Sequence, residues 1–160
     1  MTNKEMSQRA REFFQNRFHW SQAILAVGQE KMNIRNESLI KAMGGLGGGI
    51  AGDSRGICGA LLGGVAFISS LYGRGNLEEK EQPRMWRLRQ KLTEKFEDLT
   101  KEYGGIFCAD IARVNFLDRE QVKAFRENPD SRRRYCVKVV EETAYALGEI
   151  LDQAETEGLK

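Results

Sequence analysis

The sequence is poor in proline and histidine, and its cysteines are odd in number. Among 160 residues there are two prolines, one histidine and three cysteines. Three cysteines cannot pair fully within one chain, so we expect no structural disulfides. The N-terminal residues 1–5 lack the basic and then apolar pattern of a signal peptide. We therefore expect a cytoplasmic protein whose thiols stay reduced.

The chain also has a small net charge and no long uninterrupted hydrophobic segment. The formal net charge is +2, too small to indicate nucleic-acid binding without an aromatic and basic groove motif. The most apolar segment, residues 57–72, is shorter than the roughly 20 residues that cross a bilayer. Extending it upstream would place Asp53 and Arg55 in lipid. We predict no nucleic-acid partner, no membrane span and a buried central helix.

The scarcity of proline and apolar spacings of three and four residues predict an all-α fold. We expect one helical domain, residues 1–160, arranged as a compact bundle around the glycine-rich central helix. Asn36 is the expected cap of the second helix, and Asp53 or Ser54 that of the third, which should end at Gly73. Pro83 suits the first turn of the next helix. The predicted helices cover residues 14–32, 37–43, 57–72, 83–103, 108–114 and 118–127, with a last one after residues 129–131.

Glycines punctuate residues 44–64. Gly59 and Gly63 share a helix face and should let a second backbone approach closely. Gly47, Gly49 and Gly52 formally match a dinucleotide-binding pattern, but that pattern has meaning only after a strand. The preceding residues 38–43 have a helical pattern, so we do not predict nucleotide binding.

Each cysteine lies where a helix should begin: Cys58, Cys108 and Cys136. Unpaired N–H groups and the positive end of the helix dipole stabilise a thiolate there. We expect a shared thiol site, with Cys58 the most acidic thiol unless burial raises its pKa. The alternative is three inert core cysteines. The arginines at 132–134 are expected on a solvated face; otherwise they lower the pKa of Cys136 or bind an anionic partner.

Several segments together carry a family resemblance. The core is Cys58-Gly59-Ala60-Leu61-Leu62-Gly63, preceded by His19-Trp20-Ser21-Gln22-Ala23-Ile24 and Gly47-Gly48-Gly49, and followed by Leu71-Tyr72-Gly73, Cys108 and Cys136. In this order they resemble the C-GCAxxG-C-C family over roughly residues 14–151. The resemblance implies a helical, redox-active protein. It also implies that Cys58, Cys108 and Cys136 are redox residues or metal ligands, with an iron–sulfur cluster or zinc as the cofactor.

One position departs from the family pattern, because Trp20 stands where the first family cysteine is expected. Iron–sulfur and zinc sites normally need four ligands. His19 is a candidate to complete a set of three cysteines and one histidine, but it lies one residue away on a helix and so points in a direction about 100° from that of Trp20. We expect Trp20 to lie against the three sulfurs.

Two main functions therefore stay open. One is a redox or metal-cluster accessory protein with a redox partner protein. The other is a non-catalytic helical interaction protein that has lost its complete site. Small-molecule binding in the space of a lost cluster, enzymatic activity and homo-oligomerisation are also left open.

Overall fold

The computed structural model describes residues 1–158, and it confirms the all-α prediction. Helices alternate with short connections, and the only β pairing in the described part is one isolated bridge. The elements are α1 (Asn3–Gln15), α2 (Trp20–Lys31), α3 (Glu37–Met43), η1 (Gly44–Leu46), α4 (Gly59–Tyr72), α5 (Pro83–Thr100), η2 (Lys101–Tyr103), α6 (Cys108–Ile111), α7 (Arg119–Glu127) and α8 (Arg133–Gly158).

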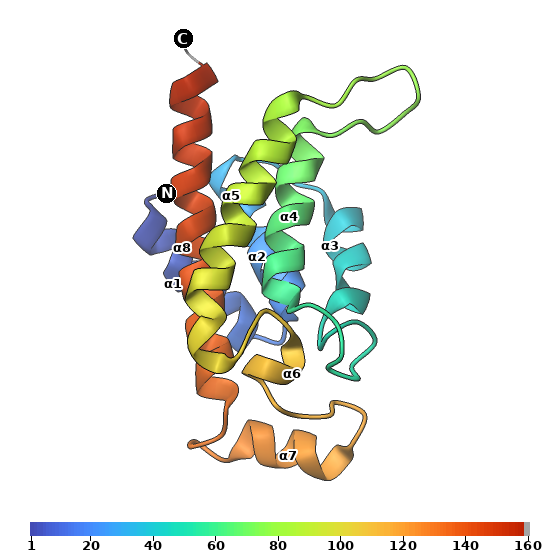
Figure 1. Ribbon diagram of the computed structural model, residues 1–160, viewed down its shortest axis with the longest axis vertical. Coiled ribbons are helices and arrows are strands. Elements are labelled where there is room, and N and C mark those ends of the chain that lie inside the picture. The colour runs from blue at the N-terminus through green and yellow to red at the C-terminus, as the bar shows by residue number, and fades with distance from the viewer. Residues whose placement is uncertain (159–160) are drawn as a thin grey trace.

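Helix α4 is the central helix, as the sequence predicts. It packs against α2, α5 and α8, and Figure 1 shows it beside α5, with α2 behind it. The close approach expected at its glycines is confirmed, because a Cβ added at Gly63 would overlap the backbone carbonyl of Ser21 in α2. Ser21 is fully buried, and its hydroxyl donates to Met43 O over 2.7 Å. Because Gly63 has no side chain, the backbone at the start of α2 contacts the central helix directly.

The predicted single helix over residues 14–32 is wrong, because the chain divides it into α1 and α2. Arg17 adopts φ 77°, Phe18 N donates to Phe13 O (3.0 Å) and Arg17 N donates to Phe14 O (3.4 Å). These two bonds form a Schellman motif, and the rings of Phe13 and Phe18, 5.5 Å apart, supply its hydrophobic contact. Arginine replaces the usual glycine in the left-handed position, so the sequence carries no stop signal here.

The helix boundaries at α3 and α5 follow the prediction closely. Asn36 Oδ1 accepts from Leu39 N at the start of α3, and Pro83 lies in the first turn of α5. The buried stripe of α5 consists of Met85, Leu88, Leu92 and Phe96. Two segments lie at opposite ends of this core: the loop of residues 73–82 projects beyond α4 and α5, and α7 crosses the other end (Figure 1).

The predicted caps of the central helix are wrong. Helix α4 begins after Cys58, which is its N-cap residue. Asp53 instead accepts from the backbone N–H and guanidinium of Arg55, and the buried Ser54 hydroxyl donates to Val114 O. The helix ends at Gly73 as expected.

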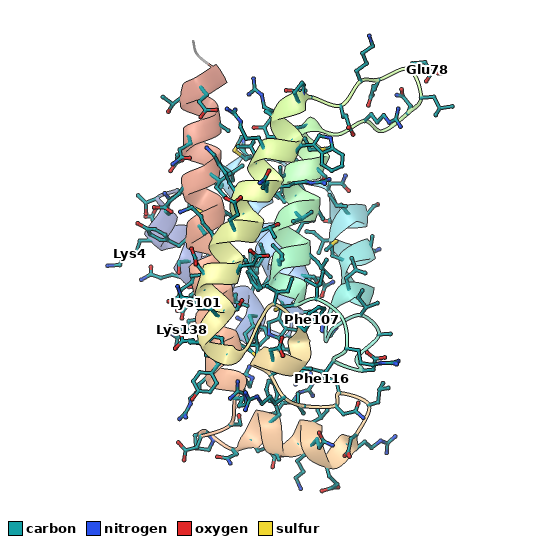
Figure 2. All side chains as sticks on the ribbon, in the orientation of Figure 1. Lys4, Glu78, Lys101, Phe107, Phe116 and Lys138 are labelled. Atoms are coloured by element: carbon teal, nitrogen blue, oxygen red, sulfur yellow. The ribbon has the colours of Figure 1, made fainter. Side chains whose placement is uncertain are left out.

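Side chains from nearly every element join one buried cluster, and Figure 2 shows how they fill the space between the helices. Within residues 1–158, none of the helices combines the length and the apolar character that a bilayer crossing requires.

Candidate functional site: three buried thiols

A short backbone pairing joins the segments that carry Cys58 and Cys108. Ile57 and Phe107 form an isolated antiparallel bridge. Cys58 N donates to Ile106 O (2.9 Å), and Cys108 N donates to Gly56 O (3.0 Å). Residues 50 positions apart in the sequence are thereby fixed side by side at the starts of α4 and α6.

This pairing also directs the two cysteines to the same side. Side chains alternate between the faces of a strand, so the residues flanking the bridge face opposite to Ile57 and Phe107. Phe107 is exposed, whereas Cys58 and Cys108 are each only 5% exposed. Diagonal neighbours in such a pair lie about 7–8 Å apart between Cα atoms. That separation is just above the roughly 4.4–6.8 Å usual for a disulfide, so bridging these residues requires a small backbone shift.

A left-handed turn covers Cys108. Residues 48–52 all have positive φ, from 58° at Ala51 to 83° at Gly52. A Cβ added at Gly49 would lie 2.7 Å from the Ser54 backbone and 3.0 Å from the Cys108 Cβ. Left-handed conformations cost non-glycine residues energy, most of all β-branched ones such as Ile50, and such strain is retained where surrounding contacts enforce it.

Hydrogen bonds to the Cys108 region hold this turn in place. Ala109 N donates to Ser54 O (2.8 Å), and Phe116 N donates to Gly52 O (3.0 Å). Burial raises the pKa of the Cys108 thiol, and a hydrogen bond with Ser54 acts in the opposite direction. The loop before α4 and the loop after α6 therefore form one closed structure over the sulfurs.

Cys136 reaches the same region from α8. It lies in the first turn of that helix and is 3% exposed. Burial raises the pKa of the Cys136 thiol, and Cys58 and Cys108 act in the same direction. Arg132, whose guanidinium donates to the carbonyls of Ile111 and Asp110, acts in the opposite direction.

Trp20 lies beside Cys136, one of the three cysteines that the sequence places against it, and its position relative to Cys58 and Cys108 stays a prediction. It is the first residue of α2 and is 7% exposed. Its ring packs 5.2 Å from Phe14 and 5.2 Å from Phe116 between centroids, and a hydrogen bond with Trp20 acts to lower the pKa of Cys136. The indole fills space beside the third thiol.

Burial governs the protonation of all three thiols. It raises the pKa of Cys58 to about 12, although the N–H groups of Ala60 and Leu61 act to lower it. Burial raises the pKa of Cys108 to about 11 and that of Cys136 well above the ordinary thiol value. Cys58 therefore does not have the low pKa that its helix N-terminus favours, because desolvation outweighs the helix N-terminus, the case that the prediction set apart.

The thiols do not form a metal centre as they stand. All three are free, and nowhere in residues 1–158 do three or more His, Cys, Asp or Glu side chains take up an arrangement that could hold a metal ion. His19 is the exposed N-cap of α2, packed against Gly47. The donor set that the resemblance implies thus does not fit a zinc or iron–sulfur site in this conformation, and the metal assignment of Cys58, Cys108 and Cys136 stays a prediction.

Sequence reasoning missed several residues that build this site. No local sequence pattern indicates that Ile57 pairs with Phe107, or that Ser54 and Phe116 belong to the site. Each of these features depends on contact with a distant segment. The only available signal was the glycine density of residues 44–64, which indicates unusual backbone conformations.

Together, the fold and these residues define a helical protein with three buried, protonated thiols at the starts of three helices. Residues 18–150 match the family described as "Putative redox-active protein (C_GCAxxG_C_C)", and the chain belongs to this family. No curated protein and no solved structure matches it.

Proposed function

We propose that this chain is a thiol redox protein in which Cys58 and Cys108 alternate between a dithiol and a disulfide. The observation that carries the proposal is the Ile57–Phe107 bridge, which holds these two cysteines on one face at adjoining helix starts. Membership of a family described as redox-active supports the same chemistry. The oxidant is a disulfide of a partner protein or small molecule.

The exchange proceeds in two substitutions. The Cys108 thiol loses its proton and attacks one sulfur of the partner's disulfide, releasing the partner's other sulfur as a thiolate. Cys58, deprotonated in turn, attacks the Cys108 sulfur of this mixed disulfide and releases the second partner thiolate. Two electrons pass to the partner, and the two protons pass to its thiolates. Cys108 attacks first because its pKa is the lower of the two.

Burial makes this a gated reaction. At neutral pH the raised pKa values keep Cys58 and Cys108 protonated, and only thiolates attack disulfides. Opening of the left-handed turn at residues 48–52 would admit water to Cys108 and lower its pKa. Partner docking, rather than the resting protein, should therefore set the rate.

The test is oxidation of the reduced protein by a small disulfide, followed by mass spectrometry of the peptides. The expected product is a Cys58–Cys108 disulfide with the loss of two hydrogen atoms. Cys136→Ser should still form it, whereas Cys58→Ser should stop at the mixed disulfide on Cys108. If the folded protein forms no intramolecular disulfide with any disulfide oxidant, the non-catalytic interaction protein becomes the better assignment.

A further inference from the structure

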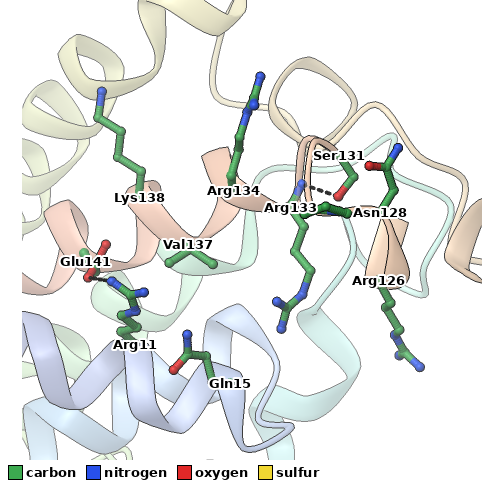
Figure 3. A pocket seen from close by; sticks show the side chains of 11 residues that line it. Arg11, Gln15, Arg126, Asn128, Ser131, Arg133, Arg134, Val137, Lys138 and Glu141 are labelled. Atoms are coloured by element: carbon green, nitrogen blue, oxygen red, sulfur yellow. Dashed lines mark hydrogen bonds and ion pairs between the residues drawn. The ribbon is translucent and has the colours of Figure 1, made fainter. Parts of the chain in front are cut away.

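A cationic pocket lies on the outer side of α8, opposite the thiols. It is an open depression of about 390 Å³ between the end of α1, the α7–α8 connection and the first turns of α8. Figure 3 shows its charged side chains around this space. Five cations and one carboxylate line it: Arg11, Arg126, Arg133, Arg134, Lys138 and Glu141.

Two of these guanidinium groups have no acidic partner. Arg126 and Arg133 make no ion pair with any carboxylate of residues 1–158. Arg133 instead lies over the Phe14 ring, 5.1 Å from its centroid. Its backbone N–H donates to Ser131 Oγ (3.4 Å). Its side-chain donors therefore remain available on the pocket side.

The other three cations each have a carboxylate partner. Lys138 pairs with Glu102 at 3.1 Å and with Glu142 at 4.0 Å. Arg11 pairs with Glu141 at 3.1 Å, which also neutralises the one acid of the pocket. The Arg134–Asp130 pair is 3.6 Å long, and both of its side chains are exposed. Exposed pairs of this kind contribute little to stability. The excess positive charge of the pocket is therefore that of Arg126 and Arg133, in a chain whose overall charge is +2.

The helix adds to this excess. The N-terminus of α8 carries a partial positive charge, and arginine in a first turn opposes it. Arg133 and Arg134 are the first two residues of this helix. A bound anion would relieve the repulsion, since it would interact favourably with both the side chains and the helix dipole.

We propose that this pocket binds a small molecule that carries two or more phosphate groups. Guanidinium groups bind phosphate oxygens through paired N–H donors, and here they line one pocket from α1, α7 and α8. A volume of about 390 Å³ falls within the roughly 300–1,000 Å³ of small-molecule sites. The site is separate from the thiol chemistry and does not depend on it.

The test is calorimetric titration of the reduced full-length protein with inorganic pyrophosphate at low ionic strength. The expected result is one saturable site per chain. The double variant Arg126→Gln and Arg133→Gln should weaken binding roughly tenfold or more, because each loses charge-assisted hydrogen bonds. Gln15→Glu, which adds a carboxylate at the pocket rim without removing a cation, should also weaken it.

The matched control removes two positive charges elsewhere. Arg74 and Lys80 are exposed in the loop at the opposite end of the molecule, and changing both to Gln should leave the affinity unchanged. Three results would overturn the proposal: no saturable binding, equal weakening in the control variant, or binding of the tricarboxylate citrate as tight as that of pyrophosphate. A glutamate-rich peptide that binds where pyrophosphate does not would assign the pocket to an acidic protein partner instead.

Discussion

The two sides of the first turns of α8 have opposite chemical environments. On the inner side Cys136 is 3% exposed and, together with Cys58 and Cys108, is kept neutral by burial. On the outer side, cations line a pocket that is open to water. The first turns of one helix thus contribute to both a closed, neutral sulfur region and an open, charged pocket.

The difference shows whether desolvation or the helix N-terminus dominates in each region. Both regions lie at a helix N-terminus, which favours negative charge. In the sulfur region desolvation is larger than this effect, so no thiolate forms. The pocket is open to water, so a charged group there carries little desolvation penalty. An anion from solution can therefore supply the negative charge that the helix N-terminus favours and that the buried thiols do not provide. Changes in the sulfur region should therefore cost stability, and changes in the pocket should cost binding.

The largest effect is expected when the indole beside Cys136 is removed. Trp20→Cys should lower the free energy of unfolding by roughly 3–5 kcal/mol, the usual cost of truncating a buried aromatic. The control is Trp86→Cys, since Trp86 is 56% exposed and should cost far less. Chemical denaturation of both variants measures the difference, and equal losses would show that Trp20 does not support the sulfur region.

Trp20→Cys also tests the metal assignment, because it supplies the cysteine that the family pattern expects. We predict that this variant binds more iron or zinc than the parent after anaerobic reconstitution, and that the metal restores part of the lost stability. Metal and sulfide content per chain, with thermal unfolding in each state, are the measurements. If the variant binds no more metal than the parent, the metal assignment fails.

A somewhat smaller loss is expected at the left-handed turn over Cys108. Gly49→Ala should destabilise the protein by about 2–4 kcal/mol, because it combines an unfavourable left-handed alanine with contact against Ser54 and Cys108. Gly45→Ala is the control, since a Cβ there meets nothing within 4 Å. We expect faster alkylation of Cys108 in Gly49→Ala, and an unchanged labelling rate would separate the turn from thiol access.

The third effect is a dependence of stability on pH. Below the ordinary thiol pKa of 9.0, the thiols are neutral in both the folded and unfolded states. Above it the unfolded chain loses protons first, so stability should fall as pH rises toward about 11–12. Each thiol contributes at most about 1.4 kcal/mol per pH unit. Cys108→Ala should flatten this decline between pH 9 and 11, whereas Arg126→Gln should not.

The smallest effect on stability is expected in the pocket. Arg126→Gln should change the free energy of unfolding by no more than about 0.5 kcal/mol, because it is an exposed residue without an ion pair. Thermal unfolding in low and high salt gives the measurement. A strong destabilisation would mean that the cationic residues are structural and would remove the contrast between the two regions.

Local signals in the sequence were enough for much of the fold. Asn36 caps α3, Pro83 starts α5 and Gly73 ends α4 because each acts on its own backbone. Where a boundary depends on tertiary packing, the same reasoning failed. The chain stops α1 at Arg17 without a glycine. Asp53 binds the nearby Arg55 and Ser54 binds the distant Val114, so neither caps α4.

The sequence by itself determined that the protein is helical, that α4 is central and that each cysteine lies at a helix start. Hydrophobic periodicity and capping are properties of neighbouring residues, and these predictions needed nothing more. Only the tertiary structure decided that Ile57 pairs with Phe107, that burial keeps the thiols protonated, and that cations from α1, α7 and α8 share one pocket. These features depend on the distances between residues far apart in the chain, and on the water that packing excludes.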